Sequence, residues 1–227
     1  NPPAIYGVAG RELNVYYHGL MARWDQYHLD VNYASGNQET ERWTWPSPTA
    51  TSGAWLLDIY GSQTYLKMTS ATGVVSVASA SAGGGAALTL LCVGDSTMAG
   101  GTVTGELLTI DAADTNLSLT LIGTKGTGTN LHEGVSGRTY TWFASDAASP
   151  FVTGGAFDFN WYLTNNALAT PTHVLFNLGI NDGFSSTTDP ALNTAWYAAK
   201  TYIDTMLTNI MAVVPTAKVA LCLPVPG

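Results

Sequence analysis

Apolar and polar residues alternate in short bursts over the first third of the chain. The bursts are centred on Leu13–Tyr17, Leu29–Tyr33, Trp43–Trp45, Trp55–Ile59 and Val75–Val77, and Gly, Pro, Ser and Asn residues separate them. A period of two places alternate side chains on one face of a strand. Residues 1–80 are therefore predicted to form a small antiparallel β-sandwich domain with a jelly-roll-like arrangement.

The pattern changes after residues 81–87, whose Ser, Ala and Gly residues predict a flexible linker. From residue 88 to residue 227, apolar runs alternate with helical patterns. The expected strands are 88–93, 117–122, 172–178 and 218–223, and the expected helices are 106–113, 157–165 and a long one that begins at Asp189-Pro190 and ends before Pro215. This alternation predicts an α/β domain with a flavodoxin-like parallel sheet and helices on both faces.

Composition limits the classes of partner. Hydrophobic residues make up 46% of the 227 residues and charged residues only 11%, so Ser, Thr, Asn and Gly must cover much of the surface. Such a mixture is common in secreted, cell-surface and phage-associated proteins. The net charge of −8 repels phosphate backbones and argues against nucleic acid as a partner. No apolar stretch approaches the length of a membrane span, and no signal segment is recognisable.

Candidate chemistry lies in three polar clusters of the second domain. The first apolar run ends in Gly94-Asp95-Ser96, and the third expected strand ends in Gly179-Ile180-Asn181-Asp182; between them lies the glycine-rich turn Glu133–Gly137. Reacting groups of an open α/β sheet sit at the carboxyl ends of its strands. A serine hydroxyl beside glycine N–H groups and an asparagine amide suits acyl transfer, which needs a nucleophile and donors to an oxyanion.

These clusters resemble the blocks of the SGNH (GDSL-type) hydrolases, and the resemblance covers residues 88–227. It implies that Ser96 is the nucleophile and that the Gly137 N–H and the Asn181 side-chain amide join the Ser96 N–H as oxyanion donors. Gly137 is preferred to Gly134 because the family's key glycine directly follows a serine. Asp95 and Asp182 are the supporting residues, and Asp182 is expected to brace the loop. No cofactor is expected, and no metal, because no cluster of His, Cys, Asp or Glu residues has the spacing of metal ligands.

One block of the family, Asp-x-x-His near the carboxyl end, has no counterpart before Gly227. Asp25-Gln26-Tyr27-His28 has this spacing but precedes the nucleophile within a strand-like pattern, so we interpret it as coincidence. His132 is expected to be a polar loop residue close to the cleft, and His173 a strand-end side chain. We therefore expect the C-terminal part of the α/β fold, with the histidine, to lie beyond Gly227, on a continuation or a companion fragment, in preference to a loss of catalysis.

The expected function is that of a serine esterase that removes acetyl or another small acyl group from a polysaccharide. A β-sandwich ahead of an SGNH domain is similar to bacterial carbohydrate esterases. Trp24, Trp43, Trp45 and Trp55 could stack on sugars, although filling the core of a small sandwich is the more ordinary role of each one.

Two alternatives stay open. One is a lipase or lysophospholipase with a groove lined by Phe143, Phe151 and Phe184, and the other is a non-catalytic glycan-binding or structural module. Cys92 and Cys222 are expected on strands separated by a third, too far apart for a disulfide, so two buried free thiols are predicted.

Overall fold

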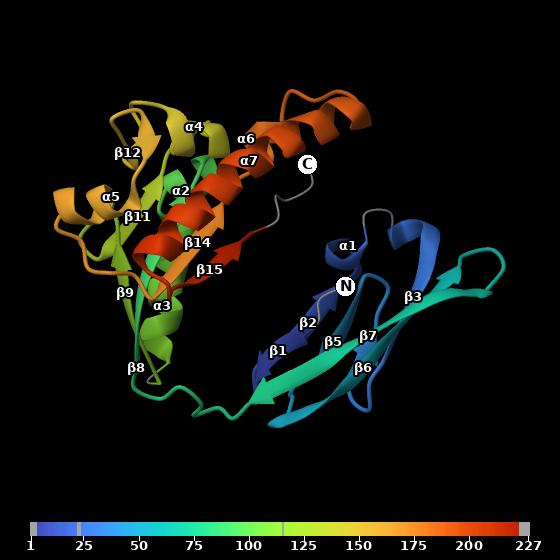
Figure 1. Ribbon diagram of the computed structural model, residues 1–227. Helices are drawn as coiled ribbons and strands as arrows, with labels where there is room; N and C mark the ends of the chain where they lie inside the picture. The colour runs from blue at the N-terminus through green and yellow to red at the C-terminus, as the bar shows by residue number, and fades with distance from the viewer. Residues whose placement is uncertain (1–3, 22–23, 115, 223–227) are drawn as a thin grey trace. The chain divides into compact units, whose positions relative to one another are not determined.

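The chain divides into two units, residues 1–83 and residues 84–227. The computed structural model describes residues 4–21, 24–114 and 116–222 (Figure 1). The boundary between the units falls within the predicted linker at 81–87, and the first strand of the second unit begins inside that linker, at Ala86.

Unit 1 (residues 1–83) contains two sheets. Its elements are β1 (Ala4–Val8), β2 (Leu13–Tyr16), α1 (Tyr17–Leu20), the 3₁₀ helix η1 (Trp24–Gln26), β3 (Tyr27–Asn32), β4 (Asn37–Gln38), β5 (Arg42–Trp45), β6 (Thr51–Gly61) and β7 (Lys67–Ala78). The strand order is β1-β7-β6-β3 in one sheet and β2-β5-β4 in the other. The prediction of a wholly antiparallel sandwich is wrong for one pair, because β1 runs parallel to β7.

The two sheets of unit 1 share one hydrophobic core. Alternate residues of the strands enter it, as the period-two pattern predicts, and Trp43, Trp55 and Val75 are at most 2% exposed. Trp45 belongs to the same core, whereas Trp24 is only half-buried at its margin. Burying the large indole rings supplies much of the apolar area that holds so small a unit together.

Unit 2 (residues 84–227) carries a six-stranded sheet, a two-stranded hairpin and six helices among its described residues. Its elements are β8 (Ala86–Gly94), α2 (Ser96–Ala99), α3 (Thr102–Ala113), β9 (Leu117–Ile122), β10 (Lys125–Thr127), β11 (Asn130–Gly134), α4 (Tyr140–Ser145), β12 (Val152–Thr153), β13 (Ala156–Phe157), α5 (Phe159–Asn165), β14 (His173–Asn177), α6 (Ile180–Gly183), α7 (Asp189–Val213) and β15 (Lys218–Leu221). Strand β8 is central: it pairs in parallel with β9, β11 and β14, and β14 pairs in parallel with β15.

The predicted fold class, a flavodoxin-like parallel sheet with helices on both faces, is wrong. The described residues form four sheets, strand content exceeds helix content, and the largest sheet is mixed because β10 runs antiparallel to β11. Glycines with positive φ allow two short hairpins whose strands the sequence pattern did not predict. Gly126 and Gly128 have positive φ in the β10–β11 hairpin, and Gly154-Gly155 has positive φ in the β12–β13 hairpin.

Strand β8 contributes side chains to two hydrophobic clusters. Leu91 and Val93 pack in the larger one with Val174 of β14 and with Met206 of α7, and Cys92 joins Met98 in the smaller one. This alternation on a strand buried on both faces explains why its sequence is almost continuously apolar. The central strand is thus held firmly up to its carboxyl end.

The helix boundaries differ slightly from the expected ones. Helix α7 is capped by Thr188, whose hydroxyl accepts from the Ala191 N–H, and not by Asp189. Helix α5 begins after Asp158, because Phe157 belongs to β13, and α3 begins at Thr102 instead of residue 106. Among the described residues, no helix combines the length and the apolar character that crossing a membrane would require.

Both cysteines are free thiols, as predicted, but only Cys92 is buried; Cys222 is half-buried, so the prediction of two buried thiols is wrong for it. Burial raises the pKa of the Cys92 thiol to about 12 and also raises that of Cys222. Residue 223, where the predicted last strand ends, lies outside the described residues.

Candidate active site

Ser96 is the first residue of α2, directly beyond the carboxyl end of β8, and it is exposed. Asp95 caps this short helix and is only 1% exposed. Its Oδ1 accepts from the Thr97 N–H at 2.9 Å and from the Thr97 hydroxyl at 2.8 Å. The backbone around the serine is therefore fixed while the serine itself stays open to solvent.

Two glycines allow α2 to lie close to the strands. A Cβ atom on Gly94 would approach Met98 Cβ to 2.5 Å, and one on Gly134 would approach the backbone N of Ala99 to 2.6 Å. Neither distance is tolerated between real atoms, so a side chain at either position would displace the helix. The Gly134 N–H donates to His132 Nδ1 at 3.0 Å and is already committed.

The loop that follows β11 contains Gly137. The Val135 N–H donates to the Gly94 carbonyl at 2.9 Å, and the Arg138 N–H donates to the Val135 carbonyl at 3.3 Å, which closes a turn. Gly137 lies in this turn with φ +73° and has open space around its Cβ position. The turn is thereby anchored to the carboxyl end of β8, the strand that precedes Ser96.

Asn181, in α6, links the clusters. Its Nδ2 donates to Asp95 Oδ2 at 3.2 Å and to the Arg138 carbonyl at 3.1 Å. The structure thus brings Asn181, the residue before Ser96 and the residue after Gly137 together at one edge of the sheet. Both N–H groups of the amide are engaged, so an oxyanion at this site would have to replace one of the two acceptors.

Asp182 braces the start of α4. Both of its carboxylate oxygens lie within hydrogen-bond distance of the Tyr140 N–H, at 3.2 and 3.3 Å. Burial raises the pKa of Asp182, and the backbone N–H that it accepts opposes this rise. The side chain connects α6 with the loop that carries Gly137.

Three residues of this region were not predicted from the sequence: Asn177, Arg138 and Trp142. Asn177, at the end of β14, donates to the Thr97 hydroxyl at 2.9 Å, and its strand register places it opposite Gly94. The Arg138 guanidinium lies 4.7 Å from the centre of the Trp142 ring. The signal for Asn177 was present, because it is the first polar residue after a buried strand run and parallel strands end at the same edge.

Of the two histidines of unit 2, His132 is placed differently from the prediction, whereas His173 is a strand-end residue as predicted. His132 is buried within β11 and is not a loop residue; burial lowers its pKa, and its Nδ1 accepts from Gly134. His173 lies at the amino end of β14, opposite Leu90, and is four residues from Asn177, about 13 Å along a strand. Asp25 and His28 lie in unit 1, as does His18, whereas Ser96 lies in unit 2.

A buried carboxyl group lies on β11, opposite Val93 of β8. Glu133 of β11 is fully buried, and its Oε1 accepts from the Tyr162 hydroxyl at 2.8 Å and from the Thr124 N–H at 2.5 Å. Its Oε2 has no hydrogen-bond partner among the described residues. Burial raises the pKa of Glu133, and the donors oppose this rise.

The groove expected for a lipase is not formed by the residues proposed for it. Phe143 and Phe151 are at most 1% exposed and belong to the large core cluster, whereas Phe184 is 81% exposed. Two of the three rings therefore support the fold and cannot line a surface groove.

Comparisons with known proteins add little. No family model and no curated protein matches the chain. Among solved structures, it is similar to a sialyltransferase from Photobacterium damsela, with a TM-score of 0.25 and 7% sequence identity over 96% of this chain and 54% of that one. The chain thus spans about half the length of that protein. A TM-score this low supports no statement about fold or function.

Proposed function

We propose that the chain is a serine ester hydrolase of the SGNH type with Ser96 as its nucleophile. The observation that carries the proposal is the set of contacts through Asn181, which joins Asp95 to the loop of Gly137. An exposed serine thereby lies next to a fixed carboxylate, a glycine turn and a side-chain amide at the carboxyl ends of parallel strands. Prearranged donors of this kind stabilise the charge that develops in acyl transfer.

In the proposed reaction, the Ser96 Oγ attacks the ester carbonyl carbon and gives its proton to a base. The carbonyl oxygen becomes an oxyanion, which accepts from the Ser96 and Gly137 N–H groups and from Asn181 once the amide leaves the Arg138 carbonyl. The carbon–oxygen bond to the alcohol then breaks and the alcohol takes the proton. Water hydrolyses the acyl-serine by the same steps and releases the acid.

The proton acceptor is not assigned to a described residue of unit 2. The Nδ1 atom of His132 already accepts from Gly134, and His173 lies at the opposite end of its strand. Because Ser96 is exposed, a base from solution can reach it. The test of the proposal therefore includes imidazole as an external base.

The first experiment is the labelling of Ser96 by a fluorophosphonate, followed by intact mass. We expect one probe per chain, a rate that increases with imidazole, and no labelling of Ser96→Ala. Ser118→Ala is the matched control, because Ser118 is an exposed serine of β9 at the amino end of β8. Asn181→Ala should lower the rate about 10²–10³-fold, the usual effect of losing one oxyanion donor. Wild-type protein that stays unlabelled in imidazole, or equal labelling of Ser96→Ala, would contradict the proposal.

The proposed substrate is a polysaccharide that carries acetyl or another small acyl group. The burial of Phe143 and Phe151 favours a small acyl group over a fatty chain, because no apolar groove is built from these rings. Acetate release from acetylated xylan, compared with the hydrolysis of long-chain p-nitrophenyl esters, tests this preference. Faster hydrolysis of the long-chain esters would favour a lipase.

A further inference from the structure

Unit 1 contains a hollow of about 390 Å³ at the edges of its two sheets, within the range of about 300–1,000 Å³ that is usual for ligand pockets. Residues of α1, η1, β3 and β4 line it, together with the turn after β4. Strand β3 ends one sheet and β4 ends the other. The hollow therefore lies where two sheet edges face each other.

Gln38 of β4 holds these edges together. Its Oε1 accepts from the Val31 N–H at 3.2 Å, and its Nε2 donates to the Leu29 carbonyl. One side chain thus satisfies backbone groups of β3 that have no neighbouring strand on that side. Specific hydrogen bonds therefore fix this wall of the hollow.

Tyr17 presents an unsatisfied polar group at this hollow. It is 2% exposed, and its hydroxyl has no hydrogen-bond partner among the described residues; the nearby Gln38 amide is engaged with the backbone of β3. Burial and the Asp30 carboxylate raise the pKa of Tyr17 to about 12, and Gln38 opposes this rise, so the hydroxyl keeps its proton at neutral pH. A buried hydroxyl without a partner is unfavourable, and a bound hydrogen-bond acceptor would relieve this cost.

The other lining residues combine aromatic faces with polar groups. Trp24 and Tyr27 are half-buried aromatic residues, and the Trp24 ring centre lies 6.2 Å from that of Tyr17. Asp25 and His28 also line the hollow and are exposed. Flat rings beside carboxylate and imidazole groups suit a ligand with an apolar face and hydroxyl groups around its edge.

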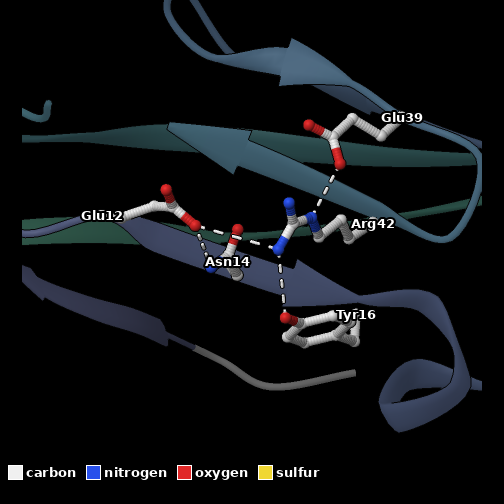
Figure 2. Close-up of polar contacts among 5 residues, drawn as sticks. All are labelled: Glu12, Asn14, Tyr16, Glu39 and Arg42. Carbon is white, nitrogen blue, oxygen red and sulfur yellow. Dashed lines mark hydrogen bonds and ion pairs between the residues drawn. The ribbon is translucent and has the colours of Figure 1, made fainter. Parts of the chain in front are cut away.

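Arg42 fixes a further carboxylate of the lining, that of Glu39. Figure 2 shows the guanidinium between its partners. Nε donates to Glu39 Oε2 at 2.7 Å, Nη1 donates to the Tyr16 hydroxyl at 3.1 Å, and Nη1 lies 3.8 Å from Glu12 Oε1. A second hollow of about 390 Å³ shares Glu39 and Thr40 with the first. The two adjoining hollows offer room for more than one unit of a linear ligand.

We propose that this double hollow is a binding site for a neutral oligosaccharide. Sugar rings have one face of C–H groups, which packs on Trp24 and Tyr27, and hydroxyl groups that pair with Tyr17 and the lining carboxylates. Asp25 lines the first hollow and Glu41 the second, and their carboxylates disfavour phosphate, sulfate and uronic acid ligands through like-charge repulsion, whereas the charge of Glu39 is offset by Arg42. The proposal rests on unit 1 alone and does not require Ser96 to react.

The test is affinity electrophoresis of the full chain in native gels that contain xylan, galactomannan or hydroxyethylcellulose. The Ser96→Ala variant is used, so that binding is measured without hydrolysis, and wild-type protein is run beside it. We expect at least one polysaccharide to retard the protein, and Trp24→Ala and Trp24→Phe to weaken binding, the former about tenfold or more. Tyr6→Ala is the matched control, because Tyr6 is 78% exposed in the same unit and does not line either hollow.

Tyr17→Phe separates binding from stability. Removing the unpaired hydroxyl should leave the urea midpoint unchanged or higher, while it weakens polysaccharide binding about three- to tenfold. The absence of retardation by all three polysaccharides would overturn the proposal, and so would equal retardation of Trp24→Ala and the parent. If polysaccharide retards the wild-type protein but the fluorophosphonate does not label it, the esterase proposal fails and the binding proposal stands.

Discussion

The candidate active site of unit 2 and the double hollow of unit 1 use their polar groups in opposite ways. At the active site, Asp95 accepts three hydrogen bonds and both N–H groups of the Asn181 amide are engaged. At the hollow, the buried Tyr17 hydroxyl has no hydrogen-bond partner among the described residues. Catalysis depends on groups that are already held in place, whereas binding depends on groups that still need a partner. The contrast therefore separates a proposed reaction site from a proposed recognition site.

The largest expected effect concerns the tryptophans of unit 1. Trp55 is 1% exposed in the core, so Trp55→Ala should lower the free energy of unfolding by about 3–5 kcal/mol. Trp24→Ala should lower it far less, because Trp24 is only half-buried. Urea unfolding, with hydrogen exchange of unit 1 peptides to locate the change, measures both. Equal destabilisation by the two substitutions would show that Trp24 belongs to the core and would weaken its assignment to the hollow.

The next prediction concerns the close packing at the active site. Gly134→Ala places a methyl group 2.6 Å from the Ala99 backbone, so α2 must move and carry Ser96 with it. We expect a loss of about 1–3 kcal/mol in unfolding free energy and slower fluorophosphonate labelling.

Gly155→Ala provides the control for this substitution. Gly155 has φ +81° and open space around its Cβ position, in a hairpin turn outside the site contacts. The Gly155→Ala substitution should destabilise the protein through backbone strain alone and leave the labelling rate unchanged. If both variants label equally fast, the position of α2 does not control Ser96.

A smaller effect is expected from the buried Glu133. Its pKa is raised above the ordinary value of about 4.5, so the folded protein binds a proton that the unfolded chain releases. Its contribution to stability is therefore present at low pH and is lost as the pH rises from the unfolded pKa through the folded pKa. Glu133→Gln should remove this part of the pH dependence and make the protein more stable than wild type at neutral pH.

Urea midpoints measured from acid to neutral pH test the role of Glu133, with Glu106→Gln on the exposed surface of α3 as the control. The difference between wild type and Glu133→Gln should grow with pH, and the difference for Glu106→Gln should not. If wild type instead becomes more stable than Glu133→Gln as the pH rises, the fold stabilises Glu133 as a carboxylate.

Sequence patterns predicted the local elements better than their assembly. Strand β9 has the predicted bounds, and the long helix α7 begins at the expected Asp189 because Pro190 suits a first turn. The antiparallel strand β10 and the β12–β13 hairpin were missed, because their strands are only two or three residues long and apolar periodicity cannot be recognised over so few positions.

At the candidate active site and the double hollow, contacts between segments far apart in the sequence could not be predicted. The Gly94-Asp95-Ser96 cluster was visible because a polar group ends an apolar run. The hydrogen bonds of the Asn181 amide could not be predicted, because its partners Asp95 and Arg138 lie 86 and 43 residues away in the sequence. The same is true of the tryptophans, since alternation marks Trp43 and Trp55 as strand residues, but only the packed sheets show that Trp24 lines a hollow.

The smallest effect is expected from the exposed one of two lysine–carboxylate pairs, of which each unit contains one. Lys200 Nζ lies 2.5 Å from Asp204 Oδ2 on α7, and both side chains are more than half exposed, so Lys200→Met should change the unfolding free energy by at most about 0.5 kcal/mol. Lys67 Nζ lies 2.6 Å from Asp58 Oδ1, but the Asp58 side chain is only 7% exposed. Lys67→Met should therefore be more destabilising, because it leaves a buried carboxylate without its cation. Urea unfolding with and without added salt tests this order, and an equal effect of both substitutions would show that water reaches Asp58 as freely as it reaches Asp204.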